Sequence, residues 1–394
     1  MSKHVDVAII GGGVMGSAVA YFLARNSDFT GRIAVVERDR SYTYAASSRS
    51  TSGFRQQFSS PVNIALSRFS IAFLKDADRQ LALGDERPGI TLVENGYLYL
   101  GNDEHVAAFE ENCVLQRGLG ANTILLSPEE LARRFPWLNV ADISIGSLGE
   151  GGEGWFDGYL LMGALQRCAI SEGAAFLHLG ADSVARDPAT GRFSLGLSDG
   201  SMLTADHVVN TAGTGSPAIA AMLGLSLPIV PVKQNVYTFE CAFRDEAMPY
   251  IFTPDGLFCR PEGPTYLAGT GIRPEDREVA LDDFEPDYER FDSEVWPLLA
   301  HRVSAFEALR FRGAWAGHYD MSEFDHNPFV GSVASVPGLY LASGFSGHGI
   351  MQAPGIGCAI AELITYGEYR SIDLSDLSFA RVARGERMRE AIQY

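Results

Sequence analysis

Three glycines near the start of the chain have the spacing of a phosphate-binding turn. Gly11, Gly13 and Gly16 stand in the order GxGxxG. Such a turn lets backbone N–H groups approach a pyrophosphate, and the helix that begins there adds positive potential. Glu37, about 20 residues further on, can accept hydrogen bonds from a ribose and would repel a 2′-phosphate, although Arg38 follows it. The pattern predicts a dinucleotide other than NADP.

A segment rich in small and hydroxyl-bearing residues follows this acid. Residues 45–55 contain several serines and two arginines, Arg49 and Arg55. The segment is either a flexible linker or a stretch that runs beside the dinucleotide toward its reactive ring. In the second case an arginine can face a phosphate, the electron-rich edge of the ring or a substrate carboxylate, and the residue types leave these roles open.

A second glycine-rich turn stands near the other end of the chain. Residues 342–349 follow the apolar run Leu339–Leu341 and precede a helical pattern that continues to Ile364. A helix N-terminus favours an anion. Because a reduced flavin is such an anion and a reduced nicotinamide is not, this turn favours FAD over NAD. His348 in the turn is either a catalytic residue or a structural one.

The elements around the first turn have the pattern of a βαβ unit. The apolar run Val5–Ile10 predicts a buried strand, Met15–Arg25 a helix and Ile33–Glu37 a second buried strand. Ser60 followed by Pro61 predicts the start of another helix.

The middle of the chain has the pattern of antiparallel strands. Within Thr91–Leu100, the tripeptide Glu94-Asn95-Gly96 predicts a hairpin-type turn before an alternating strand. Residues 230–270 indicate strands broken by Pro and Gly, and Ser127–Glu130 has the spacing of a capping box. Residues 274–294, with ten acidic and two basic residues, predict a solvated helical face or loop.

These patterns predict an α/β protein, α+β overall, in which a discontinuous Rossmann-like FAD-binding domain carries an inserted antiparallel-sheet substrate domain. The expected FAD-binding domain comprises residues 1–85, 145–225 and 325–394, and the substrate domain comprises residues 86–144 and 226–324. The length of 394 residues also suits two domains better than one.

Charge and cysteine content exclude several classes of protein. Lysine and arginine total 31 against 49 acidic residues, a formal net charge of −18, which argues against binding to nucleic acid or to an anionic membrane. The 5 cysteines are scattered without a CxxC pair, so we expect a reducing compartment and a cytoplasmic protein. Val5–Ala24 and Leu339–Ala361 are apolar but interrupted by glycines, so neither a transmembrane segment nor a secretory signal is predicted.

With these motifs the chain resembles the D-amino-acid oxidase / sarcosine oxidase (DAO) family of FAD-dependent oxidoreductases over nearly its full length. The matching runs are VVERD at 35–39, the serine-rich turn at 47–53, VVNTAG at 208–213, WAGHYD at 315–320 and GFSGHG at 344–349. One branch of the family also shares QQFS at 56–59, FPWLN at 135–139, EGWFD at 153–157 and GFSGHGIMQAPGIG at 344–357.

The resemblance implies FAD as the cofactor and a set of residues that bind it. These are Gly11, Gly13, Val14, Met15, Gly16, Glu37, Arg38, Ser47, Ser48, Arg49, Ser50, Gly53, Val184, Ala212, Gly213, Gly344, Phe345, Ser346, Gly347, His348, Gly349, Ile350 and Met351. Around the substrate we expect Arg55, Tyr250, Arg260, His318, Tyr319 and His348. An arginine, Arg55 or Arg260, would pair with a carboxylate. Tyr319 and Tyr250 would hydrogen-bond it, and His318 would assist deprotonation of an amine.

Several positions depart from the family pattern. Related sarcosine oxidases attach flavin to a cysteine just before the active-site tyrosine, where this chain has Gly317 and His318, so we expect non-covalent FAD. The family lysines that hold the substrate carboxylate and help oxygen react are replaced by Met351 and, in a looser alignment, by Leu267. An oxidase and a dehydrogenase therefore both remain open, with O2 or an unidentified carrier as the electron acceptor.

The expected activity is oxidation of the C–N bond of an amino acid or a secondary amine. Hydride would pass to flavin N5, and the resulting imine would hydrolyse. The expected partner is a small-molecule amine or amino acid, and no metal site is predicted. Two alternatives stay open, namely an FAD-dependent 2-hydroxy-acid dehydrogenase and a flavin-containing assembly or binding protein for a respiratory complex.

Overall fold

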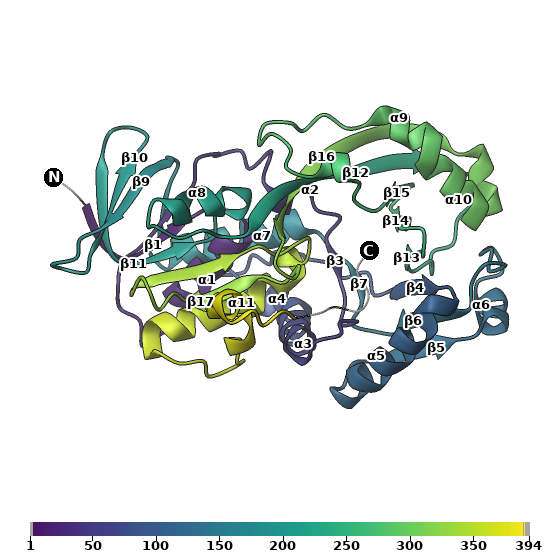
Figure 1. Ribbon diagram of the computed structural model, residues 1–394, viewed down its shortest axis with the longest axis horizontal. Coiled ribbons are helices and arrows are strands. Elements are labelled where there is room, and N and C mark those ends of the chain that lie inside the picture. The colour runs from purple at the N-terminus through teal and green to yellow at the C-terminus, as the bar shows by residue number, and fades with distance from the viewer. Residues whose placement is uncertain (1–2, 389, 391–394) are drawn as a thin grey trace.

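The computed structural model describes residues 3–388 and residue 390. Two eight-stranded sheets lie beside each other along the long axis of the molecule, and the chain passes between them several times (Figure 1). This arrangement confirms the predicted α/β class, in which a β-rich part is inserted into a nucleotide-binding part.

The first sheet is mainly parallel and brings four chain segments to one edge. The strand order is β17 (Phe329–Ser332), β18 (Leu339–Ser343), β11 (Met202–Asn210), β1 (Lys3–Ile10), β2 (Ile33–Val36) and β8 (Ala175–Leu177); β10 (Phe193–Leu197) also pairs with β11, and β9 (Ala181–Arg186) pairs with β10. β1 pairs in parallel with β2 and β11, and β11 pairs in parallel with β18, so that Ile10, Val36, Asn210 and Leu341 lie in register. The segments that follow these strands therefore meet at the carboxyl edge, where open α/β sheets bind ligands.

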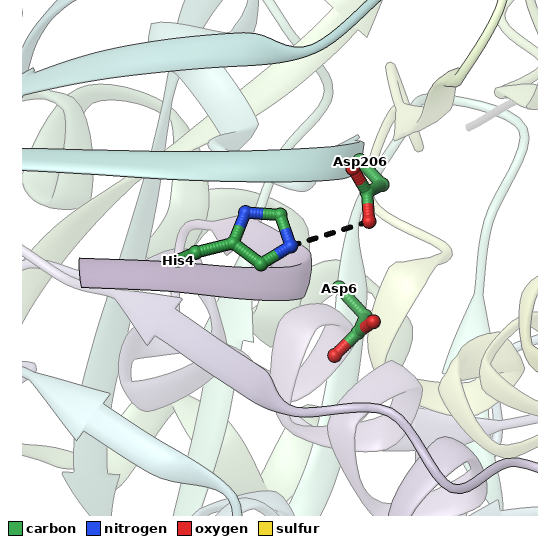
Figure 2. A group of neighbouring side chains, drawn as sticks. All are labelled: His4, Asp6 and Asp206. Atoms are coloured by element: carbon green, nitrogen blue, oxygen red, sulfur yellow. Dashed lines mark ion pairs between the residues drawn. The ribbon is translucent and has the colours of Figure 1, made fainter. Parts of the chain in front are cut away.

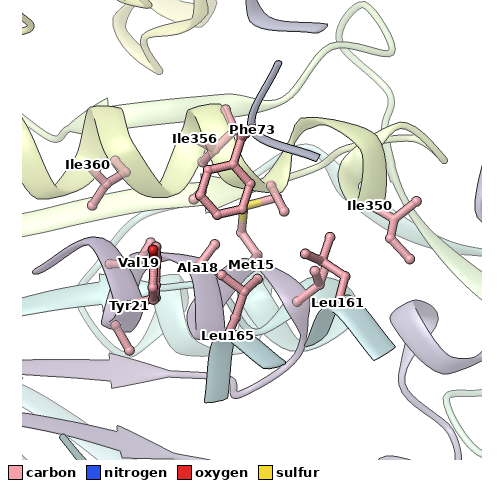
Figure 3. Packing of buried hydrophobic residues seen from close by; sticks show 14 of the residues in the cluster. Met15, Ala18, Val19, Tyr21, Phe73, Leu161, Leu165, Ile350, Ile356 and Ile360 are labelled. Atoms are coloured by element: carbon pink, nitrogen blue, oxygen red, sulfur yellow. The ribbon is translucent and has the colours of Figure 1, made fainter. Parts of the chain in front are cut away.

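One buried layer fixes the two glycine turns relative to each other. Helix α1 (Val14–Ala24) packs between α11 (Gly349–Tyr366) and α7 (Gly158–Ser171), with α3 (Pro61–Lys75) against α11. Figure 3 shows this layer, in which the side chains of Met15, Ala18, Leu161, Leu165 and Ile356 meet; all are buried. Each large apolar side chain in such a layer contributes about 1.5–3 kcal/mol.

The second sheet has two different faces. Its order is β16 (Arg310–Ser322), β12 (Ile229–Glu240), β15 (Thr265–Gly269), β14 (Phe258–Glu262), β13 (Tyr250–Phe252), β4 (Tyr97–Gly101), β6 (Ile145–Gly149) and β5 (Thr123–Leu126). Because side chains alternate along a strand, Leu98 and Ile251 enter an apolar core under α6 (Pro128–Arg134) and α10 (Trp296–Arg302). Tyr97, Tyr99 and Tyr250 belong to the opposite, aromatic face.

The remaining helices and a short two-stranded sheet complete the described chain. The small sheet pairs β3 (Gly53–Phe54) with β7 (Gly154–Trp155). The other helices are α2 (Ala46–Arg49), α4 (Ala77–Gln80), α5 (Val106–Gly118), α8 (Ser216–Ala221), α9 (Tyr288–Arg290) and α12 (Ala380–Arg384). Over the described residues, none of the helices combines the length and the apolar character needed to cross a membrane.

Three expectations about local structure need correction. The turn at Glu94-Asn95-Gly96 closes no hairpin, because Val93 bridges to Trp155 whereas β4 pairs with β6 and, in parallel, with β13.

Residues 145–149, assigned above to the FAD-binding domain, form β6 of the second sheet. We therefore propose the same domain ranges with this boundary moved past β6.

The acidic stretch 274–294 is only partly solvated. Asp276 and Arg290 form an ion pair at 2.8 Å with side-chain exposures of 6% and 2%, so this part of the stretch is buried rather than a solvated face. Arg290 also donates to the Thr270 hydroxyl, just after β15 of the second sheet, at 3.0 Å. The buried charge is tolerated because its partner neutralises it.

Candidate active site

A single cavity of about 1500 Å³ lies between the carboxyl edge of the first sheet and the aromatic face of the second. Pockets for one drug-sized ligand span roughly 300–1,000 Å³, so this cavity has room for a dinucleotide and a small substrate together. Most of the predicted residues line it: Gly11, Gly13, Val14, Met15, Glu37, Arg38, Ser47, Arg49, Ser50, Gly53, Arg55, Ala212, Gly213, Tyr250, His318, Tyr319, Phe345, Ser346, Gly347, His348, Gly349, Ile350 and Met351.

The first glycine turn forms a cradle that only glycine can build. Gly11 has φ +103°, and a Cβ there would lie 2.4 Å from the carbonyl oxygen of Thr211. The neighbouring N–H groups are held by side chains: Gly12 N–H donates to Glu37 Oε2 at 2.7 Å, and Val14 N–H donates to Ser47 Oγ at 3.0 Å. Gly13, Val14 and Met15 at the N-terminus of α1 line the cavity together with Glu37. Backbone N–H groups beside a carboxylate fit the diphosphate and ribose of FAD.

The second glycine turn is anchored by a buried acid. Gly344 N–H donates to Asp320 Oδ2 at 2.7 Å, and Ser346 N–H donates to the Asp320 carbonyl at 3.1 Å. Gly347 has φ +92°, and a Cβ there would lie 3.0 Å from the ring of Tyr319. The 18-residue helix α11 begins immediately after His348, so its positive end faces the same cavity and fits the anionic edge of a flavin.

We expect Asp320 to make the stability of the protein depend on pH. Burial raises the pKa of Asp320 to about 6, although N–H groups of the turn lower it. The folded state thus binds this proton more tightly than the unfolded state, so the contribution is present below the ordinary pKa and is lost as pH rises toward 6. Each pH unit in this window changes the free energy of unfolding by about 1.4 kcal/mol.

The matched variant is Asp320→Asn, which keeps a hydrogen-bond acceptor for Gly344 and does not titrate. Melting temperatures measured for both proteins at about pH 5 and about pH 8 should show the wild type losing stability relative to the variant as pH rises. Parallel curves would show that Asp320 has an ordinary pKa.

Arg55 is a buried cation at the junction of the two turns. The residue is 7% exposed, and its guanidinium lies over the Phe58 ring at 3.9 Å. It donates to the Gln57 carbonyl and approaches His348 Nε2 at 3.2 Å; within the described part of the chain it forms no ion pair with a carboxylate. Burial and the Arg55 charge lower the pKa of His348 to about 3, so the neutral imidazole accepts this hydrogen bond through Nε2.

Two tyrosines present protonated hydroxyls near Arg55. Burial raises the pKa of Tyr250 to about 12 and that of Tyr319 well above its ordinary range. Tyr250 donates to Thr51 Oγ1 at 3.0 Å. Tyr319 lies beside the Gly347 turn. Both side chains line the cavity as hydrogen-bond donors rather than as bases.

The structure separates two of the expected substrate residues from this group. Arg260 does not line the cavity, because its guanidinium donates to the Thr51 carbonyl at 2.8 Å and pairs with Glu262. His318 alternates with Tyr319 on β16, stacks on Phe284 at 4.3 Å and contacts the Asp283 carbonyl through Nε2 at 2.6 Å. Arg260 is therefore already paired, and Nε2 of His318 is already engaged by the Asp283 carbonyl.

Four predicted cofactor residues do not line the cavity. Gly16 lies behind the first turn, where a Cβ would meet the Gly11 carbonyl at 1.9 Å, and the 3% exposed Val184 belongs to the core of the first sheet. Ser48 and Gly344 also lie outside the lining. Gly16 and Gly344 shape the two turns. Near the start of β9, residues 179–182 line the cavity instead of Val184.

Sequence reasoning missed most of the aromatic lining. Tyr97, Tyr99, Phe252 and Phe258 line the cavity from β4, β13 and β14. The alternation Tyr97-Leu98-Tyr99 was a usable signal, because two tyrosines separated by one residue must share a face of the strand. Nothing in the local sequence tells which face meets the cofactor.

A second polar cluster lies away from the cavity. Figure 2 shows His4 pointing toward Asp206, with which it pairs at 3.3 Å, and Asp6 beside them. Two arginines share these acids, since Arg192 pairs with Asp206 at 3.0 Å and Arg32 N–H donates to Asp6 at 2.6 Å. We assign these groups to ion pairing between the neighbouring strands β1 and β11.

Comparisons with known proteins agree with this geometry. The model of the DAO family, described as FAD dependent oxidoreductase, matches residues 6–363. FAD-dependent oxidoreductase domain-containing protein 1 of Bos taurus is 38% identical over 98% of this chain and 87% of that protein. Glycine oxidase of Geobacillus kaustophilus is 28% identical over 97% of this chain and 98% of that protein.

A solved structure shows the same fold. The crystal structure of L-proline dehydrogenase from P. horikoshii superposes with a TM-score of 0.86 and 25% identity, covering 98% of this chain and 100% of that one. The glycine cradle, the facing helix α11 and these full-length matches agree with one another. The chain therefore belongs to the DAO family of FAD-dependent oxidoreductases, and FAD is its cofactor.

Proposed function

We propose that the protein oxidises the C–N bond of an amino acid or N-alkyl amino acid. The observation that carries this proposal is Arg55, a buried guanidinium that lines the FAD cavity without a paired carboxylate among the described residues. A buried charge is stable when it is paired, and a guanidinium binds a carboxylate through two parallel hydrogen bonds. Glycine oxidase and L-proline dehydrogenase, two of the similar proteins, are both named for an amino acid, which supports the same class of substrate.

The cofactor would be held by the two turns. Backbone N–H groups of residues 13–15 at the N-terminus of α1 would meet its diphosphate, Glu37 its ribose, and the N-terminus of α11 its ring. When bound, FAD supplies the acceptor of one hydride, which carries the two electrons removed from the substrate. None of the five cysteines, all within the described residues, lines the cavity, which supports the prediction of non-covalent binding.

The chain's own residues would bind and orient the substrate. Arg55 would hold the carboxylate, with its guanidinium fixed by the Gln57 carbonyl, the Phe58 ring and His348 Nε2. Tyr319 would border the bound carboxylate as a donor, and Tyr250, whose O–H already donates to Thr51, would border it through its ring. A cation beside the site disfavours a second positive charge, so Arg55 also favours the neutral amine whose lone pair the reaction requires.

The test is an anaerobic panel that compares amines with 2-hydroxy acids. We expect N-methyl amino acids or amino acids to bleach the flavin, while the matched 2-hydroxy acids leave its colour unchanged. Repeating the reaction in air and measuring peroxide separates an oxidase from a dehydrogenase. Flavin that no amine reduces would contradict the proposal; bleaching by hydroxy acids alone would favour the dehydrogenase alternative, and a stable protein partner the assembly alternative.

A buried acid behind Arg55 should make carboxylate binding depend on pH. Glu153 is 1% exposed and accepts hydrogen bonds from Gln56 N–H at 2.7 Å and Gln57 N–H at 3.1 Å. Burial raises its pKa to about 7, although Gln57 and the charge of Arg55 lower it. As pH rises through this value, the new negative charge competes for Arg55, so the affinity for a carboxylate should fall roughly three- to tenfold between about pH 6 and pH 8.

Acetate is a suitable probe because its own charge is constant in this window. Its dissociation constant should become independent of pH in Glu153→Gln and stay at the low-pH value of the wild type. The matched control is Glu150→Gln, which removes an acid paired with Arg134 at the surface and should retain the wild-type profile. The same pH dependence of the acetate dissociation constant in all three proteins would show that the charge of Glu153 does not affect binding at Arg55.

A further inference from the structure

We propose that the aromatic face of the second sheet binds an apolar substituent of the substrate, so that the preferred substrates are amino acids or N-substituted amino acids with an aromatic or bulky apolar group. This inference rests on the function proposed above and deepens it. We call Tyr97, Tyr99, Tyr250, Phe252 and Phe258 the aromatic wall; all five line the cavity.

The wall is a continuous surface of rings built by strand register. Tyr97 lies opposite Tyr250, and Phe252 lies opposite both Tyr99 and Phe258. Phe252 is the centre of the wall: it stacks on Tyr97 at 5.2 Å with an interplanar angle of 14°, and its ring centroid lies 4.6 Å from Tyr250, 5.0 Å from Tyr99 and 6.1 Å from Phe258. These separations are those of favourable aromatic pairs.

The wall begins at the carboxylate anchor. The guanidinium carbon of Arg55 lies 5.6 Å from the Tyr99 ring centroid. A carboxylate held by Arg55 would therefore place the rest of the molecule against the wall. Because the opposite side of the cavity is formed by the glycine turns that would hold the flavin, the space between them suits a flat or apolar group.

The wall is fixed in place before any substrate enters. The next residues along the same strands, Leu98, Ile251 and Cys259, are 0–3% exposed and belong to the core on the other face. On the cavity face, the Tyr250 hydroxyl is held by Thr51. Rings that need not rearrange lose little entropy on binding, so the apolar area that they cover adds directly to affinity. Phe252 is the partly exposed ring of the wall, and a substrate as small as glycine would leave it in contact with water.

The experiment compares two carboxylates that differ by one phenyl ring and cannot be oxidised as amines. Acetate and phenylacetate are titrated into the holoenzyme, and their dissociation constants are read from the perturbation of the flavin spectrum. We expect phenylacetate to bind at least about tenfold more tightly than acetate. In Phe252→Leu this ratio should fall to about threefold or less while the affinity for acetate changes less than about twofold.

A matched control uses an aromatic residue of the same sheet that faces the other way. Phe239 is fully buried in the opposite core, so Phe239→Leu should lower the melting temperature and leave the ratio unchanged. FAD content and melting temperature are measured for each variant, and Tyr99→Leu serves as a second test of the wall should Phe252→Leu not fold.

Equal affinities for the two carboxylates, no binding of either, or an unchanged ratio in the folded wall variants would each overturn the inference. These outcomes are distinct from failure of the proposed function, because the titration requires no turnover. The proposed function fails only when no amine bleaches the flavin, whatever the binding ratio is.

Discussion

Replacing Gly11 by alanine should yield a protein that no longer retains FAD. The alanine Cβ would stand 2.4 Å from the Thr211 carbonyl oxygen at a residue with φ +103°, so the turn or β11 must move. That movement displaces the N–H groups of residues 12–14 that form the cradle. We expect the affinity for FAD to fall at least about 100-fold, or about 2.8 kcal/mol.

The measurement is the amount of FAD released per polypeptide after purification, followed by titration of the apoprotein with FAD. Gly118→Ala is the matched control, because Gly118 ends helix α5, has an ordinary φ and has no neighbouring atom within 4 Å of the position that an alanine methyl would take. It should retain full FAD content. Full occupancy in Gly11→Ala as well would show that the first turn does not hold the cofactor.

Replacing Arg55 by methionine should raise KM for carboxylate-bearing amines roughly 100-fold, or about 2.8 kcal/mol. Methionine fills much of the same volume but provides neither the charge nor the paired N–H groups. The effect should be confined to substrates with a carboxylate. FAD content should be unchanged, because the two glycine turns would supply the cofactor contacts.

Arg260→Met is the informative control for Arg55. Arg260 is also buried and cationic, but it pairs with Glu262 and the Thr51 carbonyl and does not line the cavity. We expect a lower melting temperature and a KM within about threefold of the wild type. An unchanged KM in Arg55→Met would show that Arg55 does not bind the carboxylate. A large increase of KM in Arg260→Met would assign that role to Arg260.

The first βαβ unit and both glycine turns could be predicted because their signals are local. β1, α1 and β2 lie within one or two residues of the predicted ranges, and Ser127 and Glu130 form the predicted capping box. In both the βαβ unit and the capping box, the residues that show the sequence pattern are the same residues that form the structure. The same holds for the convergence of Gly11 and Gly347 on one cavity, which follows from parallel strands whose carboxyl ends share an edge.

The parts that sequence could not predict depend on long-range pairing. Glu94-Asn95-Gly96 has hairpin chemistry, yet its flanks pair with segments more than forty residues away along the chain. Arg55 and Arg260 are equivalent as residue types, and only the neighbouring Glu262 distinguishes them. The aromatic wall could be predicted only in part for the same reason, because β4 pairs with β13 from about 150 residues away in the sequence.

The proposed reaction depends most on Arg55, which would hold the substrate carboxylate and so bring the amine to the FAD in this cavity. Its most direct test is anaerobic mixing of the holoenzyme with an N-methyl amino acid and, in parallel, with the same amine without its carboxylate. We predict rapid loss of flavin colour with the first compound, little with the second, and a strongly weakened response to the first in Arg55→Met. Equal bleaching by the two compounds in the wild-type protein would contradict the claim.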